Sequence, residues 1–135
     1  MIFTPELVKS LHQRLIEKTG GEFGIKDEKG LESMLGSIYQ TFDAKESYPT
    51  HIEKASRLCF MLNTSHVFLD GNKRISMHIL AVYLRFHNFS YKPSIDEVVR
   101  VGYAIASNQM DYLQVLSWVK ETTGSFWHNY DDYFT

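Results

Sequence analysis

Two stretches of helical periodicity meet at one polar loop, residues 66–74, and this junction constrains the fold more than any other feature of the sequence. Apolar residues recur every three or four positions on both sides of the loop, as they do along the buried face of a helix. They are Ile52, Ala55, Leu58, Cys59 and Leu62 before it, and Ile75, Ile79, Val82, Tyr83 and Phe86 after it. The pattern predicts two core helices that hold the loop between them.

The N-terminal part of the chain also indicates helices. The first should begin with Thr4 as N-cap and Pro5 behind it, and should end at Gly20–Gly21, because these residue types favour helix starts and stops. A second helix should span Leu31–Phe42. Its expected buried face is Leu31, Met34, Leu35, Ile38, Tyr39 and Phe42. Between the two helices, glycines and charges predict a loop with a short extended piece at residues 23–26.

Capping signals place the other helix starts. Thr50–Glu53 and Ser94–Glu97 both have the spacing of a capping box. Asn108 or Asp111 should cap a last helix that ends at Gly124. The fold class expected from these elements is all-α, a single compact domain of about six helices.

The composition suits one globular domain over residues 1–124. The chain has 135 residues, an apolar fraction of 44% and a formal net charge of −2, which excludes disorder and gives no attraction to nucleic acid or to a membrane surface. One cysteine precludes an internal disulfide, and the N-terminus lacks the pattern of a signal peptide. We therefore expect a cytoplasmic protein. Residues 125–135 form an aromatic tail that either packs on this domain or contacts a partner.

The polar loop has the character of an anion site. The second core helix must begin near Gly71, so its unpaired backbone N–H groups and its positive dipole end point into the loop. Lys73 and Arg74 lie beside them, although cations at a helix start are slightly unfavourable unless an anion lies between them. Gly71 allows the backbone to approach a ligand closely. Phosphate is the expected anion.

The other loop residues each allow a structural and a chemical role. His66 could be a surface residue at a helix end, or a general base for a hydroxyl at neutral pH. Asp70 could be an N-cap, or hold Mg²⁺ together with phosphate oxygens and water. Asn72 could donate to phosphate or bond its own backbone. Phe68 is expected to anchor the loop in the core and so to fix where the imidazole points.

Residues 66–74 resemble the signature of the Fic/Doc family, His-x-Phe-x-(Asp/Glu)-(Gly/Ala)-Asn-(Gly/Lys)-Arg, and match all seven specified positions. Gly30–Ser33 and Glu53–Ala55 are similar to segments that precede the motif in death-on-curing (Doc) proteins. The resemblance extends over most of residues 4–120. Fic adenylyltransferases mostly have Glu, Gly and Arg at the places of Asp70, Lys73 and Met77, so the sequence resembles the Doc branch.

The resemblance implies a toxin that uses ATP, bound in reversed orientation, to phosphorylate a threonine of elongation factor Tu and so stop translation. In this reading His66 is the base, Asp70 holds Mg²⁺, and the backbone of residues 71–73 with Asn72 cradles phosphate. Lys73 and Arg74 neutralise charge in the transition state. A flap that aligns the target is expected at Phe23, Gly24, Ile25 and Lys26. An antitoxin should inhibit in trans, and homodimerisation is left open.

Two other functions remain open at the level of sequence. One is adenylyl transfer from ATP to a Ser, Thr or Tyr hydroxyl, as in Fic adenylyltransferases. The other is a catalytically idle helical module that only binds a nucleotide or a protein. The presence of both His66 and Asp70 argues against the idle module.

Overall fold

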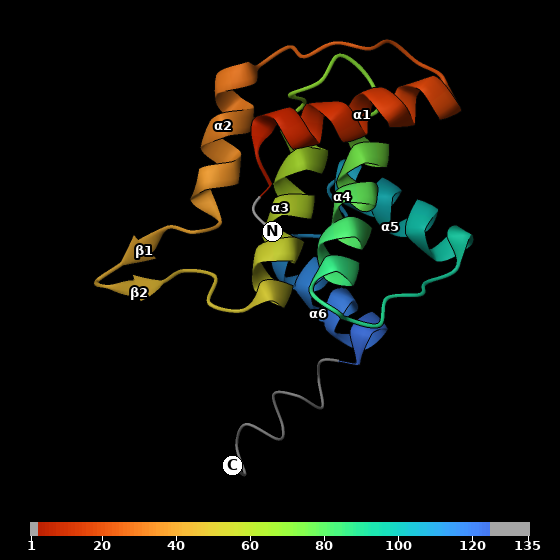
Figure 1. Ribbon diagram of the computed structural model, residues 1–135. Coiled ribbons are helices and arrows are strands. Elements are labelled where there is room, and N and C mark those ends of the chain that lie inside the picture. The colour runs from red at the N-terminus through yellow and green to blue at the C-terminus, as the bar shows by residue number, and fades with distance from the viewer. Residues whose placement is uncertain (1–2, 125–135) are drawn as a thin grey trace.

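The computed structural model describes residues 3–124, and the aromatic tail lies outside the described residues. Figure 1 shows a helical molecule with one small hairpin. The helices are α1 Pro5–Thr19, α2 Glu28–Ser37, α3 His51–Thr64, α4 Asn72–Phe86, α5 Ile95–Ala106 and α6 Tyr112–Thr123. The expected all-α fold of about six helices is confirmed. No helix in residues 3–124 is long and apolar enough to cross a membrane.

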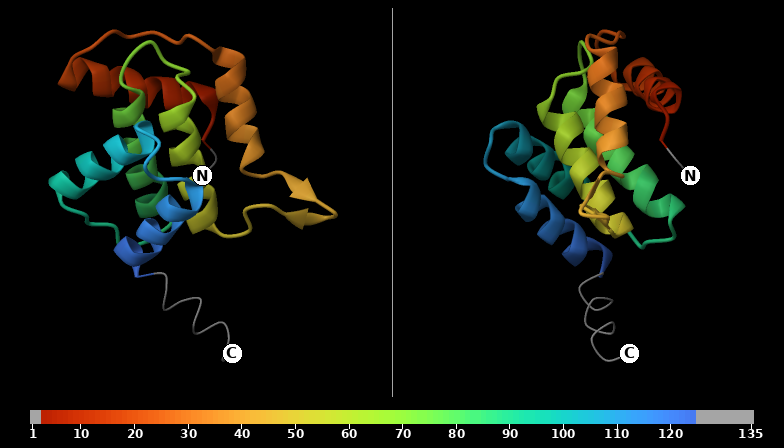
Figure 2. Two further views of the ribbon diagram at one scale, coloured as in Figure 1. Left: turned by 180° about the vertical axis from the view of Figure 1, so that it is seen from behind. Right: turned by 90° about the vertical axis from the view of Figure 1, so that its left-hand side faces the viewer.

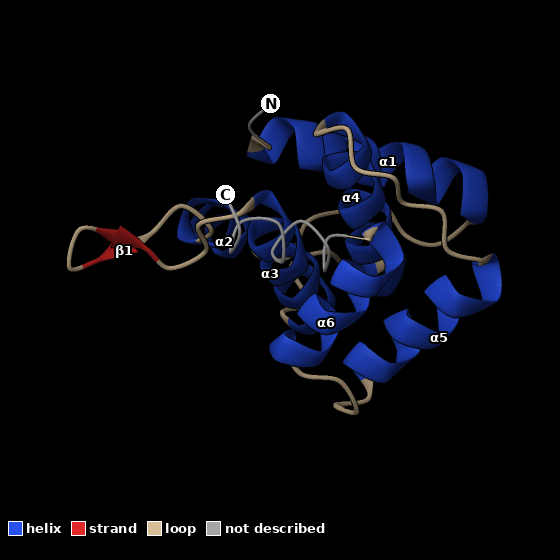
Figure 3. Cartoon of the chain, turned by 90° about the horizontal axis from the view of Figure 1, so that it is seen from below, coloured by secondary structure: helices blue, strands red, loops and turns tan. Residues whose placement is uncertain are grey.

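Helices α3 and α4 form the centre of the molecule. Figures 1 and 2 show them side by side, and Figure 3 shows α1 on one side of the pair with α5 and α6 on the other. Their facing residues are fully buried, among them Leu58, Leu62, Ile75, Ile79 and Leu80. Burying each such side chain stabilises the fold by about 1.5–3 kcal/mol relative to exposure. The pair is thus a rigid support for the loop that joins it.

Side-chain caps start these helices where the sequence predicts them. The hydroxyl groups of Thr4, Thr50 and Ser94 each accept a hydrogen bond from the backbone N–H three residues on. Asp111, rather than Asn108, caps α6 and forms a reciprocal capping box with Gln114. Each cap satisfies a backbone donor that the first helical turn leaves unpaired, which is worth about 1 kcal/mol.

The predicted limits of the second helix are wrong at both ends. α2 begins at Glu28 because the Asp27 carboxylate accepts a hydrogen bond from Gly30 N and caps the helix upstream of Leu31. It ends at Ser37 rather than Phe42. The first four residues of the expected buried face are buried, but Tyr39 is 40% and Phe42 78% exposed.

A two-stranded hairpin replaces the last turn of the predicted helix. Strand β1 is Thr41–Phe42 and pairs antiparallel with β2, Lys45–Glu46. The two turn residues, Asp43 and Ala44, both have positive φ, 52° and 62°, as the primed turns of tight hairpins require. Figure 3 shows the hairpin projecting from the helical body. At its base, the buried Lys54 ammonium pairs with the Glu46 carboxylate at 2.9 Å.

The segment between α1 and α2 runs across the polar loop. Lys26 N donates to Val67 O at 2.7 Å, and Leu69 N donates to Gly24 O at 3.1 Å. Ile25 and Phe68 thereby form a single antiparallel bridge. The short extended piece predicted at residues 23–26 is therefore present, and the strand it pairs with is the loop itself.

Candidate functional site

The loop residues line a cavity of about 300 Å³ at the junction of α3 and α4. α3 ends at Thr64, and His66 follows with a left-handed backbone, φ 53°, and an exposed side chain at the cavity. The lining residues are Asn63, His66, Leu69, Asp70, Gly71, Asn72, Lys73, Arg74 and Ala106. All the predicted polar residues of the loop therefore meet in one concave site.

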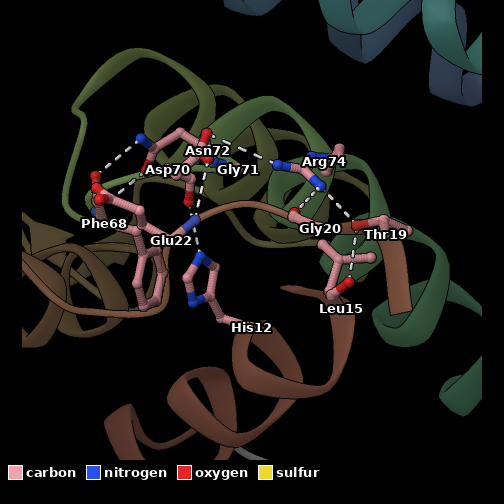
Figure 4. A network of polar contacts seen from close by, with 10 residues as sticks. All are labelled: His12, Leu15, Thr19, Gly20, Glu22, Phe68, Asp70, Gly71, Asn72 and Arg74. Carbon is pink, nitrogen blue, oxygen red and sulfur yellow. Dashed lines mark hydrogen bonds and ion pairs between the residues drawn. The ribbon is translucent and has the colours of Figure 1, made fainter. Parts of the chain in front are cut away.

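The Asn72 side chain closes the loop on itself. Its Oδ1 accepts a hydrogen bond from Phe68 N at 3.1 Å, and its Nδ2 donates to Phe68 O at 3.0 Å (Figure 4). Of the two roles that the sequence allows, the structure shows the bond to the backbone. The Phe68 ring is 2% exposed and lies in the core, so the loop is fixed at both its backbone and its side chain.

Asp70 presents a charged carboxylate at the cavity. Oδ2 accepts a hydrogen bond from Glu22 N at 3.2 Å and Oδ1 accepts one from Gly71 N at 2.8 Å (Figure 4). These two bonds, and the nearby Arg74 guanidinium, hold the pKa of the Asp70 carboxyl below its usual range. Asp70 is not the N-cap of α4, because that position belongs to Gly71.

The N-terminus of α4 opens towards the same cavity. Gly71 has a left-handed backbone, φ 76°, and no side chain caps the first turn. A Cβ atom at Gly71 would lie 3.0 Å from Ile16 Cδ1, so a side chain here would crowd α1. The uncapped N–H groups and the helix dipole favour an anion at this end.

The two cations of the motif point to opposite sides of the site. Arg74 Nη1 donates to Thr19 Oγ1 at 2.5 Å and to Gly20 O at 2.7 Å, at the end of α1. Its Nη2 lies 3.7 Å from Asp70 Oδ1. The Lys73 ammonium instead lies 4.6 Å from the centre of the Tyr103 ring on α5, a cation–π contact.

His12 on α1 supports the loop from below, and the sequence analysis missed it. Its Nε2 lies 2.7 Å from Asp70 O, and its ring stacks on Phe68 with centroids 3.8 Å apart. The imidazole is fully buried. His12 lies four residues from both Val8 and Ile16, on the buried stripe of α1. This spacing could have predicted that its side chain is buried.

The residues expected to form a flap flank the site. Gly24 and Ile25 pair with the loop backbone, while the Phe23 side chain is 55% exposed. A Cβ atom at Gly24 would lie 2.7 Å from Leu69 Cδ1. The segment is thus in close contact with the motif, and the half-exposed Phe23 ring lies beside His12 with centroids 6.1 Å apart.

The donor set fits a magnesium ion held together with phosphate. The part of the chain that the structure describes contains no group of three or more His, Cys, Asp or Glu residues arranged for a metal. Mg²⁺ commonly takes one or two protein carboxylates and completes its octahedron with water and substrate phosphates. Asp70, charged and 46% exposed at the cavity, offers one such carboxylate.

Gly21→Ala should misplace the Asp70 carboxylate. A Cβ atom at Gly21 would lie 2.5 Å from Asp70 Oδ2 and 3.0 Å from Arg74 Nη2. Because a displacement of about 1 Å in a reaction centre can cost 10²-fold, we expect a loss of activity of that order, measured as the initial rate of group transfer. Gly124→Ala is the control, since its φ is also positive, +71°, but its Cβ would meet open space. Equal activity of the two variants would contradict the prediction.

One comparison with known proteins found a family match. The family model described as "Fic/DOC family" matches residues 2–84, from α1 through most of α4 and including the loop. The search of curated proteins found no match. The family match spans more than half of the 135 residues and contains the cavity loop, and the chain therefore belongs to the Fic/DOC family.

Proposed function

We propose that this member of the Fic/DOC family transfers the γ-phosphoryl group of ATP to a hydroxyl side chain of a target protein, as the resemblance to Doc toxins implies. Family membership itself indicates a protein-modifying transferase of the Fic kind. The observation that carries the finer proposal is the pair Lys73 and Met77. Met77 is 6% exposed and packs against Cys59 and Gly102, so α4 offers no guanidinium at this place for a second phosphate.

In the proposed reaction, His66 accepts the proton of the target hydroxyl. The hydroxyl oxygen bonds to the γ-phosphorus while the bond to the β,γ-bridging oxygen breaks, and ADP leaves. The exposed imidazole at the cavity is available for this role, and histidine is the side chain that most often serves as a general base. By resemblance to Doc, the target would be a threonine of elongation factor Tu.

The other residues supply charge and position. Asp70 would hold Mg²⁺, which neutralises phosphate charge when bound. The uncapped N-terminus of α4 and the Arg74 side chain line the same cavity. They would stabilise the charge that develops on the transferred group. Hydrogen bonds to Thr19 and Gly20 hold the Arg74 guanidinium in place, so little of this stabilisation is lost to reorganisation.

Adenylyl transfer is the second candidate. In that reaction the target oxygen bonds to the α-phosphorus and pyrophosphate leaves. One observation favours it: the Lys73 ammonium rests on Tyr103 rather than over the N-terminus of α4, so in this position it does not fill the cradle as a phosphate-excluding side chain would.

Labelled ATP separates the two reactions. Purified protein, Mg²⁺ and elongation factor Tu are incubated with either γ-labelled or α-labelled ATP, and the label on the target is counted. Transfer of the γ label only is the expected result. Transfer of the α label would establish adenylyl transfer instead and overturn the proposal.

The partner proposed from the resemblance is an antitoxin that acts in trans, and an adjacent groove suits it. A groove of about 620 Å³ lies between α1, α4 and α5 and shares Lys73 and Arg74 with the cavity. Its lining includes three cations, Lys73, Arg74 and Arg85, and no acidic residue. An acidic amphipathic helix would complement this charge and would block the site.

Val99→Glu should weaken inhibition by such a helix. Val99 lines the groove and is 56% exposed, and a carboxylate there would repel an acidic partner and interrupt the apolar surface. The measurement is the ratio of inhibited to uninhibited transfer for each variant in the presence of a candidate antitoxin. Leu113→Glu, at a 68% exposed position of α6 outside the groove, is the control. An unchanged ratio in Val99→Glu would place the antitoxin elsewhere.

A further inference from the structure

We propose that His12 is a positioning residue of the reaction centre, which holds the carbonyl group of Asp70 through a hydrogen bond from Nε2. The inference rests on the proposed function for its consequence in catalysis, but its geometry is independent of which group is transferred. His12 belongs to α1, far from the motif in sequence, and reaches the loop at the carbonyl group of Asp70.

The hydrogen bond fixes the tautomer of His12. Its Nε2 lies 2.7 Å from Asp70 O, and because a carbonyl oxygen can only accept, Nε2 must carry the hydrogen. Nδ1 is buried without a hydrogen-bond partner among the described residues. A second proton there would add an unpaired donor and a charge in a fully buried ring, which is costly.

The face of the His12 ring is held as well as its edge. The ring stacks on Phe68 with centroids 3.8 Å apart, and it is fully buried. The stacking and the hydrogen bond together fix the plane and the direction of the imidazole.

This contact bears on the geometry of the site through one residue, Asp70. Its carbonyl group is held by His12, while its carboxylate is held by Glu22 N and Gly71 N. The peptide that follows the carbonyl leads into Gly71, whose left-handed backbone starts α4. Fixing the carbonyl therefore fixes the direction of both the carboxylate and the first N–H groups of the helix. An apolar residue would fill the same space but leave this peptide free to rotate.

The test uses two substitutions that differ in one respect. His12→Gln retains an N–H donor near the position of Nε2, whereas His12→Leu retains apolar volume only. We expect His12→Leu to lower kcat for transfer about 10–100-fold, the range seen for residues that orient a metal ligand, and to raise the Mg²⁺ concentration needed for half-maximal rate. His12→Gln should have a kcat and a Mg²⁺ requirement close to those of the wild type. Melting curves define a temperature at which all three proteins are folded, and the rates are compared there.

Two results would overturn the proposal. One is equal Mg²⁺–ATP affinity, measured by calorimetry, for wild type and His12→Leu. The other is a ¹⁵N chemical shift of His12 that shows the proton on Nδ1. Neither measurement needs group transfer. If the protein transferred no group, the proposed function would be refuted, and these two measurements would still test the role of His12.

Discussion

His66→Ala is expected to abolish transfer while leaving the binding of Mg²⁺–ATP nearly unchanged. His66 lines the cavity but makes none of the contacts that close the loop, which come from Asn72 and His12. Removal of a general base typically costs about 10²–10⁴-fold in rate. The measurement is the initial rate with γ-labelled ATP, together with calorimetric binding of the nucleotide.

His51→Ala is the matched control for this variant. His51 is also an exposed histidine, but it is the first residue of α3, and His66 lies beyond the other end of that helix. At a rise of 1.5 Å per residue the two are separated by about 20 Å. The control should transfer at close to the wild-type rate at a temperature where it is folded. Transfer at the wild-type rate by His66→Ala would show that His66 is not the general base and would favour a purely structural role for it.

The helical part of the fold could be predicted because its signals are local. The caps at Thr4, Thr50 and Ser94 and the stripe along α3 and α4 act within one or two turns of the chain. The C-terminal end of α2 was predicted too late because Tyr39 and Phe42 continue the apolar spacing beyond the helix end. Their exposure shows that spacing alone does not bury a side chain once the helix has ended.

The identities of the site residues could also be predicted, whereas their partners could not. The loop from His66 to Arg74 is contiguous in sequence, so its polar groups had to meet near the start of α4. The contacts that orient it come from residues 48–58 positions away, namely Glu22, Gly20, Thr19 and His12. No periodicity or spacing links such positions, because their meeting depends on how α1 crosses α4.

Asn72 shows the same limit within the loop. The sequence leaves two roles open for its amide, and only the folded loop shows that both of its polar ends bond to the Phe68 backbone. This hydrogen bonding determines which polar groups of the loop can contact a ligand. If the amide orders the loop, then the polar groups left to face a ligand are the helix N-terminus, Asp70 and the two cations.

Asp70→Asn should therefore remove the one carboxylate that the loop offers to Mg²⁺, with little change in shape. An amide has the size of a carboxylate, and its oxygen can still accept one of the two backbone hydrogen bonds from Glu22 and Gly71. Because a bound metal contributes several kcal/mol of charge stabilisation to such a reaction, we expect transfer to fall by at least about 100-fold. The Mg²⁺ requirement should also rise.

Asp43→Asn is the control. It distinguishes the effect of removing a charge at the site from the effect of changing the net charge of the protein. Asp43 lies in the hairpin turn with φ 52°, a conformation that asparagine tolerates, and the substitution removes the same unit of charge. The two variants are compared in a titration of transfer rate against Mg²⁺ concentration. A right-shifted titration for Asp70→Asn alone is the expected result. Coincident titrations would mean that the metal is held by the nucleotide without Asp70, and the carboxylate would then serve only to orient Arg74, 3.7 Å away.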